Sequence, residues 1–262
     1  MARKIVITSG KGGVGKTTLV THLGRKLAST GCRVLLIDGD FGLNNLDLSV
    51  GVENKVSYDL LDVLTGKCRI RQALIKDNFE KNLFILPSDR LSVSSSFTAT
   101  NIKTALSGIG KLFDYVFIDS PAGMDEGFYR AIRLADEVLV VVNSDFSSLR
   151  DADKVISAVK NEGIEKVNVI MNKVRGDLLL SGYGIFPKDL EELIKCQVIG
   201  VVPETDDFLN FTADKLPTFS RAQKSISILA ENLQKGSYRL YDATKNYRGF
   251  LGSIKRAIKR SV

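Results

Sequence analysis

The sequence predicts an α/β protein with a doubly wound, mostly parallel sheet and helices on both of its faces. Short apolar runs recur along the 262 residues and alternate with stretches of helical periodicity. The runs are apolar throughout, as strands are when helices cover both sides of a sheet. The hydrophobic and charged fractions, 44% and 26%, are ordinary for a globular chain, so they exclude neither an enzyme nor a binding protein.

Seven apolar runs are predicted to be strands. They span residues 4–9, 33–38, 83–87, 115–119, 137–142, 166–171 and 198–203. Helical patterns lie at 16–29, 128–134, 147–161 and 187–195. Ligands of such sheets bind at the carboxyl ends of the strands, so we expect the functional residues directly after the strands.

The first strand is followed by a phosphate-binding loop. Residues 10–18 match G-x-x-x-x-G-K-[ST] between a strand and a helix, which predicts ATP as the ligand. Glycines in this motif let backbone N–H groups point at phosphates, Lys16 compensates the terminal phosphates, and the Thr17 hydroxyl is a ligand for Mg²⁺. Lys11 is an additional lysine at a position that the general motif leaves free. The predicted nucleotide-binding residues of the loop are Lys11, Gly12, Gly13, Val14, Gly15, Lys16, Thr17 and Thr18.

Acidic residues follow two further predicted strands. Asp119 ends the run 115–119, which is the position of a carboxylate on the Mg²⁺ side of a phosphate loop. Asp38 and Asp40 follow the second strand, where they are placed to orient an attacking water or to support the metal, and the sequence leaves their roles open. The alternative is that these aspartates only cap loops or helices. Asn172, at the end of a later strand, has the donor and acceptor to pair with adenine, although a turn asparagine fits equally well.

The positive charge of the chain is concentrated at its C-terminal end. Of the net charge of +7, six charges come from residues 245–262, which contain no acid, so the remainder carries +1. Apolar residues of this segment form one helical stripe, which predicts an amphipathic, basic, membrane-binding tail at 245–262 after an ATPase domain at 1–244. The predicted membrane-binding residues are Phe250, Leu251, Ile254, Lys255, Arg256, Ile258 and Lys259. The alternative is a terminal helix docked on its own domain.

Other classes of protein are disfavoured by simpler features. The three cysteines are far apart and in no C-x-x-C spacing, which argues against a metal cluster or a disulfide framework. The sequence shows neither a leader before the first strand nor an apolar run near the roughly 20 residues that span a bilayer. We therefore expect a cytoplasmic protein that is peripheral on the cell membrane.

The motifs resemble those of the ParA/MinD family of deviant Walker A P-loop ATPases. The loop from Lys11 to Thr18 resembles the deviant Walker A sequence of that family. Residues 38–40 with 42–47 resemble its switch I, and residues 119–123 its switch II. Segments 58–66 and 72–77, which carry no nucleotide chemistry, also resemble the MinD branch, so the resemblance covers essentially the whole chain.

The resemblance implies roles for individual residues. The catalytic set would be Lys11, acting across a nucleotide-sandwich homodimer, Lys16, and Asp40, which positions water. Thr17, Asp38 and Asp119 would form the metal side. Asn172, Pro203 and Glu204 would form the adenine-side wall, and Ser148, Arg150 and Asp153 lie on the helix that meets regulators. The enzyme would be an ATPase that is slow unless a partner and the membrane stimulate it.

The branch of the family decides the biological role. The MinD branch positions the division septum by recruiting a MinC-like division inhibitor to an anionic membrane surface, together with a MinE-like regulator or a polar scaffold. A ParA-like DNA-segregation ATPase, a flagellar-number regulator and a nucleotide-gated scaffold with incidental turnover are the alternatives. Because the excess charge lies on an amphipathic end instead of the folded body, the sequence favours the MinD branch and no sequence-specific nucleic acid.

Overall fold

A single twisted sheet organises the molecule. The computed structural model describes residues 2–40, 45–88, 98–210, 214–250 and 252–253. Within them, eight strands form a sheet in the order β3-β4-β2-β5-β1-β6-β7-β8, and its pairs are parallel except for the antiparallel pair β3–β4. The strands are β1 (Arg3–Thr8), β2 (Val34–Asp38), β3 (Ile75–Lys76), β4 (Leu83–Leu86), β5 (Tyr115–Asp119), β6 (Glu137–Val142), β7 (Lys166–Val174) and β8 (Gln197–Pro203).

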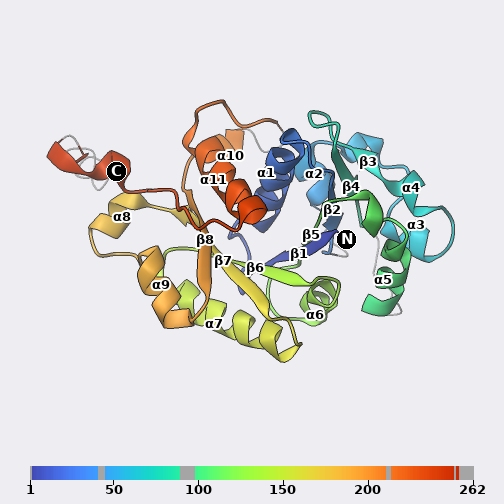
Figure 1. Ribbon diagram of the computed structural model, residues 1–262, viewed down its shortest axis with the longest axis horizontal. Coiled ribbons are helices and arrows are strands. Elements are labelled where there is room, and N and C mark those ends of the chain that lie inside the picture. The colour runs from blue at the N-terminus through green and yellow to red at the C-terminus, as the bar shows by residue number, and fades with distance from the viewer. Residues whose placement is uncertain (1, 41–44, 89–97, 211–213, 251, 254–262) are drawn as a thin grey trace.

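Helices cover both faces of this sheet (Figure 1). One face packs against α1 (Lys16–Ser29), α2 (Leu46–Val50) and α11 (Arg221–Lys235). The other face packs against α5 (Ala99–Ser107), α6 (Glu126–Ile132), α7 (Phe146–Asn161) and α9 (Pro187–Ile194), with α3 (Leu60–Leu64) and α4 (Ile70–Ala73) beside them. The short helices α8 (Gly176–Leu180) and α10 (Asp207–Asn210) follow β7 and β8. The doubly wound sheet predicted from the sequence is therefore confirmed.

The apolar strands explain why two layers of helices are needed. All six residues of β6 are buried. Successive side chains point to opposite faces, so Val138, Val140 and Val142 join one core, whereas Leu139 and Val141 join the other. Burial of each such side chain contributes about 1.5–3 kcal/mol, so both faces must be covered for the sheet to be stable.

The predicted elements match the structure closely, with a few differences at their ends. The helix predicted at 16–29 is found there, and β7 continues three residues beyond the predicted end at Met171. The prediction did not include the two-residue strand β3 or the helices α2, α3, α4, α5, α8, α10 and α11. Of these, α11 packs on β8 and α1. No motif in the sequence marks α11, although the structure places it beside the phosphate-loop helix.

The start of the C-terminal tail differs from the prediction. The predicted apolar stripe begins at Tyr247, whereas Lys245–Tyr247 forms a short 3₁₀-helix that contacts α8. Gly249 follows with a φ of 72°, a left-handed conformation that ends the turn. Tyr247 therefore belongs to the folded body. Phe250 is 83% exposed. The other predicted membrane-binding residues, Leu251, Ile254, Lys255, Arg256, Ile258 and Lys259, lie outside the described residues.

Among the helices that the structure describes, none is both long and apolar enough to cross a membrane.

Candidate nucleotide site

The loop between β1 and α1 has the backbone that phosphate binding requires. Gly15 caps α1 with a φ of 93°, and a Cβ there would lie 2.5 Å from Nδ2 of Asn172. Both the conformation and the close approach therefore require glycine. No side chain caps the N-terminus of α1, all of whose residues are described, and its first turn contains no acid. Its N–H groups and its positive end are thus available to an anion.

Lys16, the first residue of α1, is buried and hydrogen-bonded within the chain. Lys16 is 8% exposed, and its Nζ donates to Oγ of Ser9, 3.1 Å away. Burial lowers the pKa of Lys16, although the nearby carboxylates of Asp119 and Asp40 raise it. The ammonium group thus lies where a further negative charge stabilises it.

The side-chain oxygens of Thr17 and Asp119 fit a divalent cation. Oγ1 of Thr17 donates to Oδ2 of Asp119 at 2.5 Å. The other carboxylate oxygen, Oδ1, is buried and has no hydrogen-bond partner among the described residues. Burial raises the pKa of Asp119 to about 6. A buried carboxylate with a free oxygen beside a threonine hydroxyl is the oxygen donor set that Mg²⁺ prefers, so these residues fit the ion.

Asp38 lies directly beside Asp119, since β2 and β5 pair with these two residues in register. Its Oδ1 accepts the N–H of Asp40 at 2.9 Å, and its Oδ2 accepts the N–H of Leu46 at 3.2 Å. Burial, followed by the charge of Asp119, raises the pKa of Asp38 to about 8. Asp38 therefore holds both ends of the switch I segment together, and its predicted role beside the metal stays a prediction. Residues 42–44 of that segment lie outside the described residues.

Asp40 is half-buried and lies close enough to Lys16 for each charge to act on the other. Burial raises the pKa of Asp40, and the ammonium of Lys16 opposes that rise. Asp40 therefore lies within electrostatic reach of the lysine of the phosphate loop. Its assignment to an attacking water stays a prediction.

Lys11 contacts a helix of its own chain. Its Nζ donates to Oγ of Ser147 at 2.6 Å and lies 3.2 Å from Oδ2 of Asp151, both on α7. The side chain is 40% exposed. In the single chain the lysine is held against α7, and the contact across two subunits that the family resemblance implies stays a prediction. This in-chain partner could not be read from the motif, because α7 follows Lys11 by more than 130 residues.

The predicted partner-binding residues of α7 differ in exposure. Arg150 and Asp153 are exposed, whereas Ser148 is 4% exposed. Ser148 donates its backbone N–H and its Oγ to the carboxylate of Asp145, the N-cap of α7. Ser148 therefore supports the start of the helix from beneath the surface that Arg150 and Asp153 form.

A cavity of about 770 Å³ opens beside the loop. Most of the predicted nucleotide residues line it: Gly13, Gly15, Lys16, Thr17, Thr18, Asn172, Pro203 and Glu204, but not Lys11, Gly12 or Val14. The remaining lining residues were not predicted; they are Leu19, Lys173, Thr205, Asp206, Asp207, Phe208, Leu209 and Arg221. Lys173 could have been predicted to line the cavity, because it follows Asn172 at the end of a predicted strand. Arg221 comes from α11, which no motif marks.

Asn172 and Lys173 also support the loop itself. Nδ2 of Asn172 donates to the carbonyl oxygen of Val14 at 2.7 Å, and Nζ of Lys173 donates to that of Gly13 at 2.6 Å. One N–H of the Asn172 amide is thus used within the protein. Asn172 also lines the cavity, and its predicted contact with adenine stays a prediction.

Known proteins share this arrangement. The family described as "AAA domain" matches residues 2–172. The septum site-determining protein MinD of Thermotoga maritima is 37% identical over 237 residues, which cover 90% of this chain and 88% of that protein. Together these matches decide the family. The chain belongs to the MinD family of septum site-determining ATPases.

Solved structures of this family superpose on the whole fold. In the MinC:MinD cell division protein complex of Aquifex aeolicus, the matched chain is 36% identical, with a TM-score of 0.83 and coverage of 92% of this chain and 99% of that one. MinD complexed with Mg-ADP from Pyrococcus horikoshii is 29% identical, with a TM-score of 0.76 and coverage of 90% and 97%. A ParA family ATPase from Chlorobium tepidum, at 19% identity and a TM-score of 0.73, shares the fold.

Proposed function

We propose that this chain binds and hydrolyses ATP with Mg²⁺, dimerises when ATP is bound, attaches to an anionic membrane surface and there recruits a MinC-like division inhibitor. One observation supports this most directly: Lys16 and Thr17 line a cavity large enough for a nucleotide, and Thr17 donates a hydrogen bond to the buried carboxylate of Asp119. The relative solved with Mg-ADP supports the same ligand class.

The residues divide the work of hydrolysis. Mg²⁺, which Thr17 and Asp119 would hold with Asp38 behind them, supplies positive charge to the phosphates. Lys16 compensates the terminal phosphates from its buried position, and the N-terminus of α1 adds its N–H groups. Asp40 holds the attacking water in line, which is why its position next to Lys16 matters.

Lys11 couples the nucleotide to dimerisation. Its contacts with Ser147 and Asp151 involve a side chain that is 40% exposed, and an exposed ion pair contributes only about 0–1 kcal/mol. A phosphate group presented by a second subunit is a stronger partner for the ammonium group. The lysine therefore leaves α7 when the dimer forms, and Ser147 and Asp151 lose their cation at the same time.

Two tails bind a membrane better than one. A single basic segment gains about 1 kcal/mol for each cation near an anionic leaflet, against an ordering cost of about 1–2 kcal/mol for each backbone residue. Joining two tails in one dimer raises the apparent affinity by up to about 10²–10⁴ without any new contact. ATP-driven dimerisation therefore controls how long the protein stays on the membrane.

Recruitment of an inhibitor belongs to the surface of α7. Arg150 and Asp153 are exposed next to the site where Lys11 is held, so a change at Lys11 alters the surface beside them. The relative solved as a MinC:MinD complex supports a MinC-like partner. A MinE-like regulator or a polar scaffold would use the same helix to stimulate turnover.

Sedimentation with vesicles tests the whole proposal. The full chain is mixed with vesicles of phosphatidylglycerol and phosphatidylcholine in ATP or in ADP, and compared with a chain ending at Gly249, which keeps the Lys245–Tyr247 turn. We expect sedimentation only for the full chain and only with ATP. Equal sedimentation in ADP would show a constitutive anchor, and equal sedimentation of the shortened chain would remove the tail from the mechanism.

A further inference from the structure

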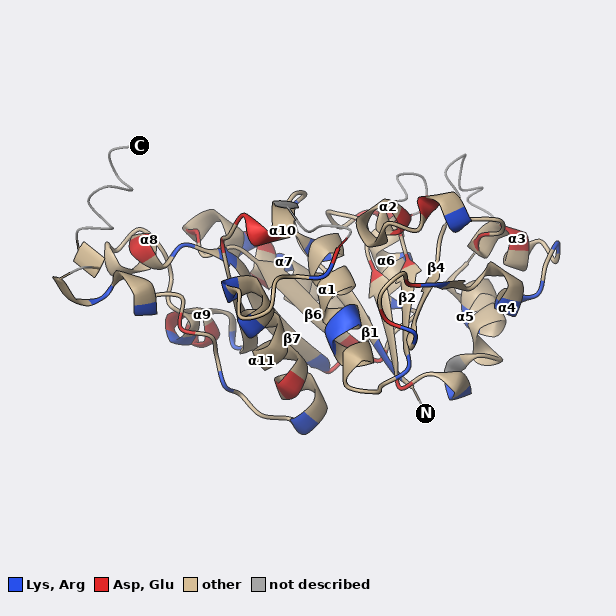
Figure 2. Cartoon of the chain, turned by 90° about the horizontal axis from the view of Figure 1, so that it is seen from above, with Lys and Arg blue, Asp and Glu red and all other residues tan. Residues whose placement is uncertain are grey.

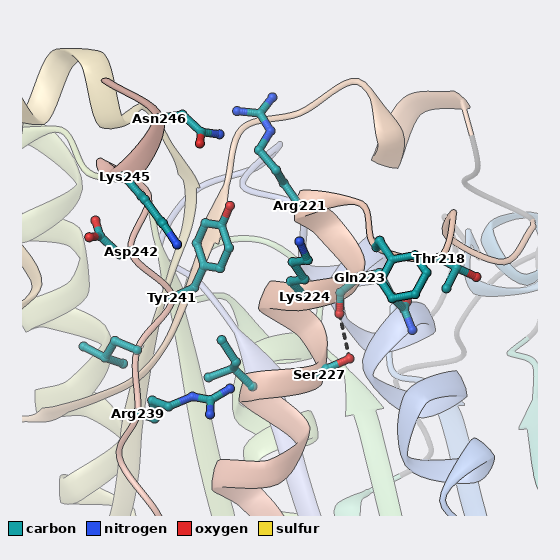
Figure 3. Close-up of a pocket in the computed structure, with 13 residues that line it drawn as sticks. Thr218, Arg221, Gln223, Lys224, Ser227, Arg239, Tyr241, Asp242, Lys245 and Asn246 are labelled. Atoms are coloured by element: carbon teal, nitrogen blue, oxygen red, sulfur yellow. Dashed lines mark hydrogen bonds between the residues drawn. The ribbon is translucent and has the colours of Figure 1, made fainter. Parts of the chain in front are cut away.

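A second cavity, of about 610 Å³, lies between α11 and the chain segment 239–246 (Figure 3). Basic side chains enter it from both walls. Arg221 and Lys224 come from α11, whereas Arg239 and Lys245 come from the segment that leads to the C-terminal tail. Tyr241 lies between the two pairs. The cavity is separate from the phosphate loop, although Arg221 lines both.

The described residues leave the positive charge of this cavity in excess. Asp242 is the one acid among its lining residues, and its carboxylate already accepts the N–H and the Oγ1 of Thr244, at 2.9 and 2.6 Å, and lies 3.6 Å from Arg248. Across the described ranges of the chain, no salt bridge involves Arg221, Lys224, Arg239 or Lys245. Figure 2 shows basic and acidic residues interspersed over most of the molecule, so this concentration of cations is local. The cavity therefore suits an anion.

The lining is also partly apolar. Ile228 and Leu240 line the cavity together with Phe219, which is 80% exposed. Phe219 has a φ of 67°, an unfavourable conformation for a bulky residue. An exposed aromatic ring next to cations is what the interface between lipid headgroups and acyl chains accommodates.

The position of the cavity points to the same source of anion. Lys245 and Asn246, which line it, lie in the 3₁₀-helix directly before the segment that carries the predicted membrane-binding residues. Phe250, four residues after Asn246, is 83% exposed. A cavity at the root of a membrane-binding tail comes close to the headgroups whenever the tail binds.

We propose that this cavity binds the phosphodiester headgroup of an anionic lipid, so that the folded body contacts the membrane beside the tail. The inference rests on the proposed membrane attachment and adds a second contact to it. The headgroup phosphate lies among the four cations, and Phe219 inserts beside it. The tail then supplies attachment, whereas the cavity supplies a preference for phosphate-bearing lipids over other negative charges.

The test compares two pairs of charge reversals in the full chain with ATP. Lys224→Glu with Arg239→Glu alters the cavity and leaves Arg221, which also lines the nucleotide cavity, in place. Lys103→Glu with Lys111→Glu is the matched control, since both lysines are exposed and lie on α5 or just after it, near the opposite end of the sheet. Lys224→Gln with Arg239→Gln is a milder second variant, and thermal unfolding checks that each variant folds.

Affinity is measured with two kinds of vesicle of equal negative charge, one containing phosphatidylglycerol and one containing oleate. On phosphatidylglycerol we expect the cavity variant to lose about tenfold or more in affinity beyond the loss of the control pair, because it loses charge-assisted hydrogen bonds to the phosphate in addition to diffuse charge. On oleate it should lose only what the control pair loses. Equal losses on both vesicles, or equal losses in both variant pairs, would show that the cavity contributes only non-specific electrostatic attraction. Either result would overturn the proposal.

Soluble probes separate this inference from the proposed function. Glycerophosphoglycerol, the headgroup without acyl chains, should bind the wild-type chain weakly and the cavity variant not at all, as measured by calorimetry, even if the vesicles show no ATP dependence. Inorganic phosphate that binds as well as glycerophosphoglycerol would mark a site for free phosphate. Loss of binding to duplex DNA in the cavity variant, with vesicle binding intact, would mark a nucleic-acid surface; either result overturns the lipid proposal.

Discussion

The phosphate loop and the cavity at the root of the tail are both rich in basic side chains, but these side chains differ in their contacts with the rest of the protein. In the loop region each lysine donates to an acceptor of the same chain: Lys16 to Ser9, Lys11 to Ser147, and Lys173 to the carbonyl of Gly13. Around the second cavity, Arg221, Lys224, Arg239 and Lys245 form no salt bridge with any described residue. The first set of cations is positioned before a ligand arrives, whereas the second depends on an anion from outside.

This difference suits the phosphate loop to selective nucleotide binding and the second cavity to attachment to a charged surface. Cations held by internal acceptors lose little freedom when phosphates bind, which favours a defined geometry. Exposed cations without partners gain most of their energy from the surface that they meet, and salt weakens that gain. Changes in the loop should therefore alter nucleotide chemistry, and changes in the second cavity should alter salt-sensitive binding to surfaces.

Lys16→Ala should have the largest effect. It removes the buried ammonium group that compensates the terminal phosphates, so ATP affinity should fall by about 10²-fold or more and turnover should vanish. Binding of a fluorescent ATP analogue measures the loss. Lys173→Ala is the matched control, because it removes an exposed lysine of the same cavity, and it should cost only a few-fold. A variant that keeps wild-type affinity would show that the phosphates bind elsewhere.

Lys11→Ala should separate nucleotide binding from dimerisation. The backbone N–H groups, Lys16 and Thr17 remain to hold ATP, so affinity should change little, whereas turnover should fall by about 10³-fold because the cross-subunit cation is lost. Light scattering with ATP should report a monomer, and vesicle sedimentation should be lost with it. Ser147→Ala removes one of the two in-chain partners of Lys11, leaves Asp151 in place, and should dimerise at least as well as the wild type. A Lys11→Ala monomer that still sediments fully would make the tail a constitutive anchor.

Asp40→Ala should retain ATP binding and dimerisation but hydrolyse about 10²-fold more slowly, because the carboxylate that orients water is lost. The protein should accumulate on vesicles. Phosphate release with lipid present measures the rate. Normal turnover would transfer the role to Asp38, whose substitution should also destabilise the fold, since its carboxylate holds the N–H groups of Asp40 and Leu46.

His22→Leu should change the pH dependence of stability. His22 lies on α1, is 3% exposed, and contacts Phe208 of the nucleotide cavity with ring centroids 5.5 Å apart. Burial, with the charge of Arg25 nearby, lowers its pKa to about 3. The unfolded chain takes up this proton below about pH 6.5, whereas the folded chain does not, so stability falls as the pH drops from 6.5 towards 3.

Urea unfolding at pH 7 and pH 5 measures this effect. The wild type should lose about 2 kcal/mol more than His22→Leu between these two values. His22 is the only histidine in the sequence, so the variant removes all histidine titration and the difference has one source. Equal losses in the two proteins would show that the pKa of His22 is the same in the folded and the unfolded chain.

Seven of the eight strands in the described sheet could be predicted because each of them carries its own signal, whereas the order of the strands was not predicted. Runs such as Tyr115–Asp119 and Glu137–Val142 were located with the bounds found in the structure, since residues buried on both faces read as continuous apolar sequence. The phosphate loop was equally readable, because its chemistry needs adjacent residues in a fixed order. Asp38 and Asp119 were found by their place after strands, and the register of β2 and β5 brings them side by side.

The sequence did not predict contacts between distant segments. The motif that contains Lys11 does not indicate Ser147 or Asp151, and the helical stripe of the tail counted Tyr247, which the structure places in a 3₁₀-helix against α8. The net charge of the body also gave no indication of the basic cavity. A small net charge on residues 1–244 conceals Arg221, Lys224 and Arg239, because acids elsewhere on the body cancel them in the sum.

The sequence by itself determined the strands, the order of the loop residues and the acids that follow the strands, since each depends on neighbours along the chain. Only the tertiary structure decided which lysine meets which acceptor and where cations gather without one. The physical reason is range: hydrophobic periodicity and loop chemistry act over a few residues, whereas electrostatic neighbours are set by packing. In this protein Lys11 and Ser147, 136 residues apart, meet only because the pairing of β1 with β6 brings the loop after β1 beside the helix after β6.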